Sequence, residues 1–137
     1  MKKLLVIFVL VGSVSASADS WRPVSTDDLT CTGTMAGQPD ITLEIQAAAG
    51  SNRTNILIKQ AGETPQVLMA REDLGVGSEG NVYIQQVSNE LGYNLFLSGE
   101  GLEEVLAGET KQVSLTGSLN LFNDGLDFRL SCSGTLH

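Results

Sequence analysis

The sequence predicts an all-β domain: an eight-stranded antiparallel meander closed into a small barrel, with one short helix near 101–107. Apolar and polar residues alternate along most of the chain, which is the period of a half-buried strand. Glycine, proline and asparagine recur between these segments, as expected for turns. The two cysteines of the chain stand in matching phrases near its ends, at 29–35 and 130–136. A β-sandwich is the alternative, because a disulfide can also join two sheets.

Residues 1–18 are predicted to be a cleaved signal peptide. Lys2 and Lys3 precede an apolar run at 4–11, and Ala16-Ser17-Ala18 matches the small-residue cleavage site. The apolar run is too short to cross a hydrocarbon core, which needs roughly 20 residues. We therefore expect export to the periplasm or the extracellular space, with no membrane span after cleavage. The mature chain would hold an extended lead-in at 19–28 and one β domain at 29–137.

The first half of that domain is expected to contain four strands. The pattern places them at 29–35, 40–48, 55–61 and 66–71. In the second of these, Ile41, Leu43 and Ile45 alternate with polar residues, so they are expected to face the core. The segment 72–80 contains three glycines and is predicted to be a loop.

The second half is expected to contain four more strands, at 81–88, 93–98, 111–122 and 126–136. The last two are the clearest, because they alternate over most of their length. Asn123-Asp124-Gly125 stands between them and is typical of a hairpin turn. Leu102, Val105 and Leu106 have helical spacing, and Gly108 is expected to end that helix.

Closure of the barrel depends on Cys31 and Cys132. Both lie in the apolar phase of their strands, and an exported protein meets oxidising conditions, so we expect a disulfide between them. If the two strands pair antiparallel with the cysteines opposed, Leu29 faces Gly134 and Leu130 faces Gly33. An even number of strands in a meander lets the last pair antiparallel with the first. Loss of the bond is expected to loosen these two strands before the others.

Charge and residue types argue against several functions. Cleavage removes two of the eight basic residues and none of the sixteen acidic ones, so the formal net charge changes from −8 to −10. Such a chain is not expected to bind nucleic acid. His137 is the only histidine, which leaves no triad, and no metal or cofactor motif is present. Glu103 and Glu104 are neighbours on the predicted helix and should diverge by about 100°. We expect no enzymatic activity.

Five apolar residues fall on the second face of their strands: Leu57, Leu68, Tyr83, Val87 and Phe96. This excess has two interpretations. The 101–107 helix and the segment around Trp21 could cover that face. Large exposed apolar patches are uncommon on monomers, which favours this first interpretation. Alternatively, the five residues form an exposed surface for a partner.

Two functions remain from the sequence. The first is an exported, non-enzymatic β domain that binds a protein or a component of the cell envelope. The alternative is a lipocalin-like carrier with a small apolar ligand inside the barrel, an analogy of fold alone. Its basis is the set of small inward residues that could leave space: Gly33, Ala47, Gly117 and Gly134.

Overall fold

The computed structural model describes residues 20–137, so the predicted signal peptide lies outside the described residues. Ten strands and one short helix are found in this part of the chain. In chain order the elements are β2 (Trp21–Pro23), β3 (Thr26–Thr34), β4 (Ile41–Ala47), β5 (Thr54–Gln60), β6 (Gln66–Ala70), β7 (Gly75–Glu79), β8 (Asn81–Ser88), β9 (Tyr93–Glu100), α2 (Leu102–Leu106), β10 (Lys111–Leu121) and β11 (Leu126–Leu136).

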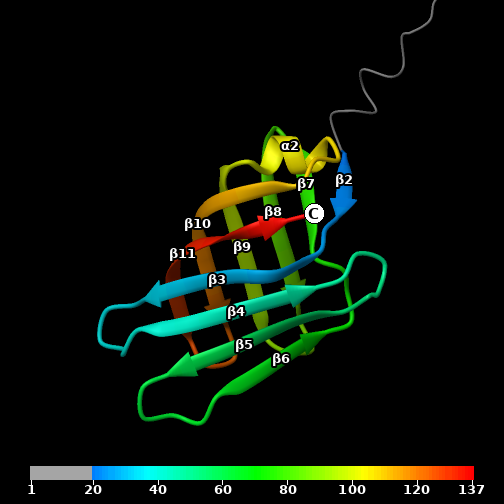
Figure 1. Ribbon diagram of the computed structural model, residues 1–137. Coiled ribbons are helices and arrows are strands. Elements are labelled where there is room, and N and C mark those ends of the chain that lie inside the picture. The colour runs from blue at the N-terminus through cyan, green and yellow to red at the C-terminus, as the bar shows by residue number, and fades with distance from the viewer. Residues whose placement is uncertain (1–19) are drawn as a thin grey trace, which may run out of the picture.

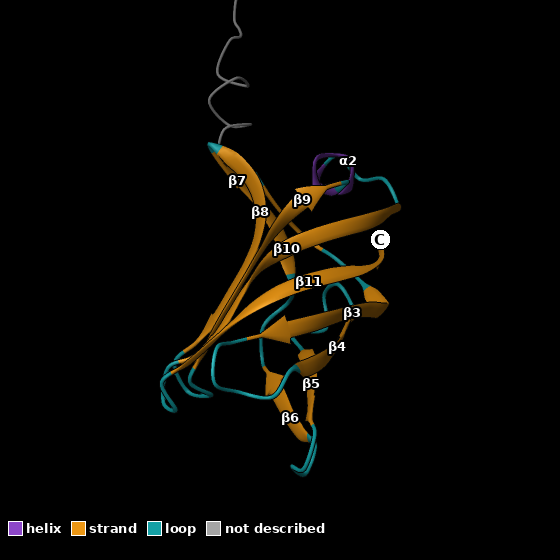
Figure 2. Ribbon diagram, turned by 90° about the vertical axis from the view of Figure 1, so that its left-hand side faces the viewer, coloured by secondary structure: helices purple, strands orange, loops and turns teal. Residues whose placement is uncertain are grey.

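All ten strands belong to one antiparallel sheet, in the order β2-β7-β8-β9-β10-β11-β3-β4-β5-β6. The order contains two runs of consecutive strands. We call β3–β6 the N-terminal meander and β7–β11 the C-terminal meander. They meet where β11 pairs with β3. The sheet curls into a half-barrel, so that the N-terminal meander lies in front of the C-terminal one in Figure 1 and beside it in the turned view of Figure 2.

The two residues that join β2 to β3 explain why the sheet curls. The N–H of Val24 donates to the carbonyl of Leu74 (2.8 Å), and the N–H of Ser25 donates to the carbonyl of His137 (3.0 Å). Successive N–H groups of an extended chain point to opposite sides, so this segment reaches β7 on one side and the end of β11 on the other. β2 and β3 are first and seventh in the sheet order, yet only two residues separate them. The sheet must therefore bend back on itself at this end.

The predicted disulfide is present at the junction of the two meanders. Cys31 pairs with Cys132 in the β3–β11 register, and their Cα atoms are 4.0 Å apart. Both cysteines are buried, so the bond faces the core. Leu130 lies opposite Gly33, as predicted. A Cβ atom added to Gly134 would lie 2.7 Å from the Cα of Leu29, which places these two residues against each other as well.

The core lies between the two curled halves of the sheet. Strands of both meanders contribute apolar side chains at every second residue, as the alternating patterns predict. In β10, for example, Val113, Leu115 and Leu119 are buried. α2 adds Leu102 and Val105 to the same core. The helix ends where predicted, because Gly108 has the left-handed φ of 104° that stops a helix.

The closed eight-stranded barrel is a wrong prediction, although the all-β class is confirmed. The sheet has ten strands and is open, and because it is one sheet it is not a two-sheet sandwich either. The predicted loop at 72–80 contains β7, and the lead-in contains β2. Consecutive strands β6 and β7 do not pair, since the segment between them carries the chain from one meander to the other. β7 pairs with β2 instead.

Candidate functional site

The five predicted partner residues do not form one surface. Leu68 points inward from β6 and is buried in the core, so its assignment to the outer face is wrong. Leu57 lies on the outer face of β5, half-buried. Tyr83 and Val87 of β8 and Phe96 of β9 lie together on the outer face of the C-terminal meander. In the sheet order, β10, β11, β3 and β4 separate the two groups.

The group on β8 and β9 is extended by a residue that the prediction did not include. Phe96 pairs with Gln85, so Tyr83 and Val87 flank it diagonally on the same face. The rings of Tyr83 and Phe96 stack with their centroids 5.5 Å apart. On the side of Tyr83 away from Phe96, Tyr83 pairs with Gly77 of β7, and Gly77 pairs in turn with Trp21 of β2. We call Trp21, Tyr83, Val87 and Phe96 the aromatic surface.

Glycines of β7 allow the tryptophan to lie on the sheet. A Cβ atom added to Gly75 would lie 2.3 Å from the ring of Trp21, so the ring occupies the space that a side chain would need. The spacing Gly75-x-Gly77 leaves one face of a strand bare, which is a signal that sequence reasoning could have used. Trp21 and Tyr83 then line one shallow depression of about 340 Å³, together with Ser78 and Glu79.

The aromatic surface remains exposed to solvent. Trp21 is 57% exposed, Val87 41% and Phe96 37%. α2 does not cover it, because Leu102 and Val105 of the helix pack into the core. The segment around Trp21 contributes to the surface instead of hiding it. The guanidinium of Arg22 donates to the carbonyl of Val105 (2.7 Å), which ties β2 to the helix and holds Trp21 in place.

A second apolar group lies on the outer face of the N-terminal meander. Leu57 is joined there by Val67 and Met69 of β6, which pair with Leu57 and Asn55 across the two strands. Val67 is 61% exposed and Met69 50%. Both residues are missing from the prediction. We call Leu57, Val67 and Met69 the β6 surface.

The largest side-chain network is structural. Inside the sheet, the hydroxyl of Tyr93 donates to Gln86 Oε1 (2.6 Å), and Gln86 Nε2 donates to Thr54 Oγ1 (3.0 Å). The hydroxyl of Thr54 donates in turn to the carbonyl of Glu72 (2.8 Å). Burial, with a smaller contribution from the charge of Glu72, raises the pKa of Tyr93 far above its usual value. The tyrosine therefore stays protonated at neutral pH and serves as a hydrogen-bond donor.

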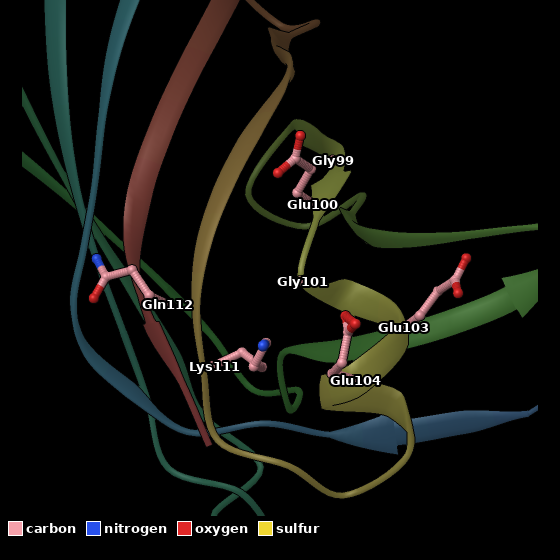
Figure 3. A pocket seen from close by; sticks show the side chains of 7 residues that line it. All are labelled: Gly99, Glu100, Gly101, Glu103, Glu104, Lys111 and Gln112. Atoms are coloured by element: carbon pink, nitrogen blue, oxygen red, sulfur yellow. The ribbon is translucent and has the colours of Figure 1, made fainter.

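Acidic residues gather beside α2. Glu100, Glu103, Glu104 and Lys111 line an open depression of about 580 Å³ between the helix and β10. Figure 3 shows that Glu103 and Glu104 point in different directions, as expected for neighbours on a helix. Within residues 20–137, no three histidine, cysteine, aspartate or glutamate residues are placed to hold a metal ion. These side chains form a solvated acidic surface.

The small residues that were expected to face inward lie against other parts of the chain. A Cβ atom on Gly33 would lie 2.6 Å from Cγ1 of Ile41, and one on Gly117 would lie 1.8 Å from the carbonyl oxygen of Phe96. At Gly134 the obstacle is the backbone of Leu29. Ala47 is half-buried at the end of β4. These small residues allow strands and side chains to approach one another closely.

The comparisons with known proteins found no match. No protein-family model and no curated protein matches the sequence, and no solved structure matches the fold. Among the described residues, no helix has the length and apolar character to cross a membrane. The disulfide indicates an oxidising compartment outside the cytoplasm.

Proposed function

We propose that this protein is an exported, non-enzymatic β domain that binds a protein or another component of the cell envelope through its aromatic surface. The observation that carries the proposal is the row of Trp21, Tyr83, Val87 and Phe96 across β2, β8 and β9, in which Tyr83 is half-buried and the other three are exposed. Tryptophan and tyrosine are the residues most enriched at energetic centres of protein interfaces. Complete burial of one such side chain is worth about 1.5–3 kcal/mol, so a partner that covers several would bind measurably.

Rigidity and charge support the same proposal. The rings lie on paired strands, and Trp21 is held by the β2–β7 register and by Arg22, so little conformational entropy is lost on binding. The formal charge of −10 expected for the cleaved chain favours a partner that is neutral or basic around its apolar centre. Export is supported by the pattern at 1–18 together with the disulfide.

The experiment uses the cleaved chain, 19–137, as bait for envelope extracts, with chemical cross-linking and mass spectrometry. Val87→Ser/Phe96→Ser should reduce capture by about tenfold or more, because two exposed apolar contacts are lost. Val67→Ser/Met69→Ser is the matched control, since Val67 and Met69 are 61% and 50% exposed on β6, which five strands separate from β9 in the sheet order. Equal capture by both variants, or unfolding of the first, would show that the surface is not the binding site. Export is checked separately, on protein expressed from the full sequence: an intact mass that retains residues 1–18 would contradict cleavage of a signal peptide.

A further inference from the structure

One end of the aromatic surface combines two rings with a carboxylate around a shallow depression. The depression has a volume of about 340 Å³, and Trp21, Gly77, Glu79 and Tyr83 are among the residues that line it. Trp21 pairs with Gly77 and Gly77 pairs with Tyr83, so these three residues form a row on one face of the sheet. Two strand spacings, or about 10 Å, separate the ends of the row.

Gly77 forms the bare floor of this depression. A Cβ atom added there would lie 3.6 Å from Cδ1 of Trp21, which is an ordinary contact. The indole ring covers Gly75 instead. The ring of Tyr83 stacks on Phe96 of β9, on the side away from β7, so its other face borders the depression. An open space therefore remains above Gly77, with an aromatic ring on each side.

Glu79 supplies a negative charge at one end of this space. Val76 is buried, so the alternation of β7 places Glu79 on the same outer face as Gly77. Glu79 is exposed, and its carboxylate forms no ion pair within residues 20–137. None of the described residues that line the depression is basic. Arg22, the basic residue closest to Trp21 in the sequence, donates to the carbonyl of Val105 and is thus directed to α2.

This combination is complementary to an organic cation, and arginine suits it best. A cation is attracted to the face of an aromatic ring, most strongly to that of tryptophan, and arginine makes such contacts more often than lysine. Its guanidinium is planar, is weakly hydrated for a cation and can donate two parallel hydrogen bonds to one carboxylate. We infer that the depression receives an arginine side chain of a protein partner, whose guanidinium lies against Trp21 and Tyr83 and donates to Glu79. The inference rests on the proposed function and names the partner as a protein.

The charge of the whole chain favours a protein over a lipid as the source of the cation. A cationic lipid headgroup such as choline is attached to a phosphate, which the formal charge of −10 expected for the cleaved chain would repel. Asp19, the first residue of that chain, adds an α-ammonium and a carboxylate, whose charges cancel. Phe96 and Val87 continue the aromatic surface beyond Tyr83, so an apolar residue next to the arginine can pack on them.

Three blocked peptides serve as probes: acetyl-Arg-Leu-amide, acetyl-Lys-Leu-amide and acetyl-citrulline-Leu-amide. Citrulline has the shape of arginine without its charge. NMR titration of chain 19–137 into the tens of millimolar should move the indole N–H signal of Trp21, the only tryptophan, together with backbone signals of 77–83. The arginine peptide should bind tightest, and the citrulline peptide should bind about threefold or more weakly than it. Added salt should weaken the arginine peptide, because Glu79 is exposed.

Glu79→Gln should weaken binding of the arginine peptide by about threefold or more and leave the citrulline peptide unaffected. Glu63→Gln is the matched control, because Glu63 is an exposed carboxylate in the turn between β5 and β6. Tyr83→Leu keeps an apolar side chain and removes one ring, so it should weaken the arginine peptide as well.

Four results would overturn the inference. One is the absence of any shift with the arginine peptide. Another is equal affinity for the arginine peptide and either of the other two. The third is binding that Glu79→Gln leaves intact. The fourth is a Trp21 shift with choline chloride at lower concentration than with the arginine peptide, which would assign the depression to a lipid headgroup.

The capture experiment with envelope extracts separates this inference from the proposed function. Glu79→Gln should reduce capture by about threefold or more, and Glu63→Gln should not. Capture that Val87→Ser/Phe96→Ser weakens and Glu79→Gln leaves intact would retain the aromatic surface as a binding site and reject the arginine. Binding of the arginine peptide that depends on Glu79, without any capture, would support the arginine site and contradict the envelope partner.

Discussion

Tyr93, Gln86 and Thr54 connect the two meanders by side-chain hydrogen bonds inside the core. Tyr93 and Gln86 belong to β9 and β8, whereas Thr54 begins β5 on the facing half of the sheet. A buried polar group is costly when its partner is lost, so each member depends on the others. The network fixes how the two halves of the sheet face each other.

Tyr93→Phe should lower the free energy of unfolding by about 1–3 kcal/mol at neutral pH, because Gln86 Oε1 loses its donor. Folding raises the pKa of Tyr93 above the ordinary value of 10.0, so its contribution is complete below pH 10 and is lost as the pH rises further. Urea unfolding measured from neutral to strongly alkaline pH should show this loss in the original chain and a smaller loss in the variant.

Tyr83→Phe serves as the control for that substitution. Tyr83 lies on the outer face, where it stacks on Phe96 and its hydroxyl has no role in the core network. Its stability at neutral pH should be nearly unchanged. Equal losses in the two variants would show that the hydrogen bond of Tyr93 contributes nothing specific.

Alternation of apolar and polar residues over seven or more positions predicts the strands well. The five-residue strands β6 and β7 are too short for this pattern to identify them and their faces reliably. β10 and β11 have eleven residues each, so their inward and outward faces could be read directly. β6 contains Val67, Leu68 and Met69 in succession, and a period of two cannot decide which of three apolar neighbours faces inward. For this reason the sequence pattern places Leu68 on the outer face and does not identify Val67 and Met69 there.

The sequence pattern does not indicate β7, for a different reason. Glycine has low strand propensity, and Gly75 and Gly77 make the segment resemble a loop. The strand forms because β2 and β8 pair with it on both sides and the ring of Trp21 covers its bare face. Trp21 stands some fifty residues before β7 in the sequence, so only the tertiary structure shows that the two meet.

Gly75→Ala tests the contact between β7 and Trp21. The new methyl group would overlap the ring, so Trp21 should move into solvent. Its fluorescence should shift to longer wavelength and become easier to quench with acrylamide. Because Trp21 is the only tryptophan, the signal has one source. Gly77→Ala is the control, since its methyl group would make an ordinary 3.6 Å contact with the ring. Identical spectra for the two variants would contradict the packing described.

For the whole molecule, the matching cysteine phrases predicted the one long-range contact that sequence could supply. Cys31 and Cys132 fixed the β3–β11 pairing and its register. Sequence could not reveal that β6 and β7 separate, because consecutive strands usually pair. It also gave no sign that β2 would occupy the edge of β7. These two departures turn an eight-stranded closed barrel into an open sheet of ten strands.

Cys31→Ala/Cys132→Ala should destabilise the protein by up to about 4.7 kcal/mol, the entropy of a closed loop of about 100 residues. The bond lies in the middle of the sheet, where the two meanders meet. Amide exchange should therefore increase first along β3 and β11, in agreement with the expectation from the sequence. Thr30→Ala/Ser133→Ala is the matched control, because these residues form the adjacent outward pair. Unchanged unfolding of the cysteine variant would contradict a stabilising bond.

The connection between the meanders has a consequence for the integrity of the chain. Between β6 and β7 the backbone passes from one meander to the other through residues 71–74, beginning at the exposed Arg71. A protease that cuts there divides the polypeptide into two fragments, with Cys31 in one and Cys132 in the other. The disulfide holds the fragments together, each of them an uninterrupted meander except for the β2 segment. A nicked molecule can thus remain one covalent unit and keep its shape until it is reduced.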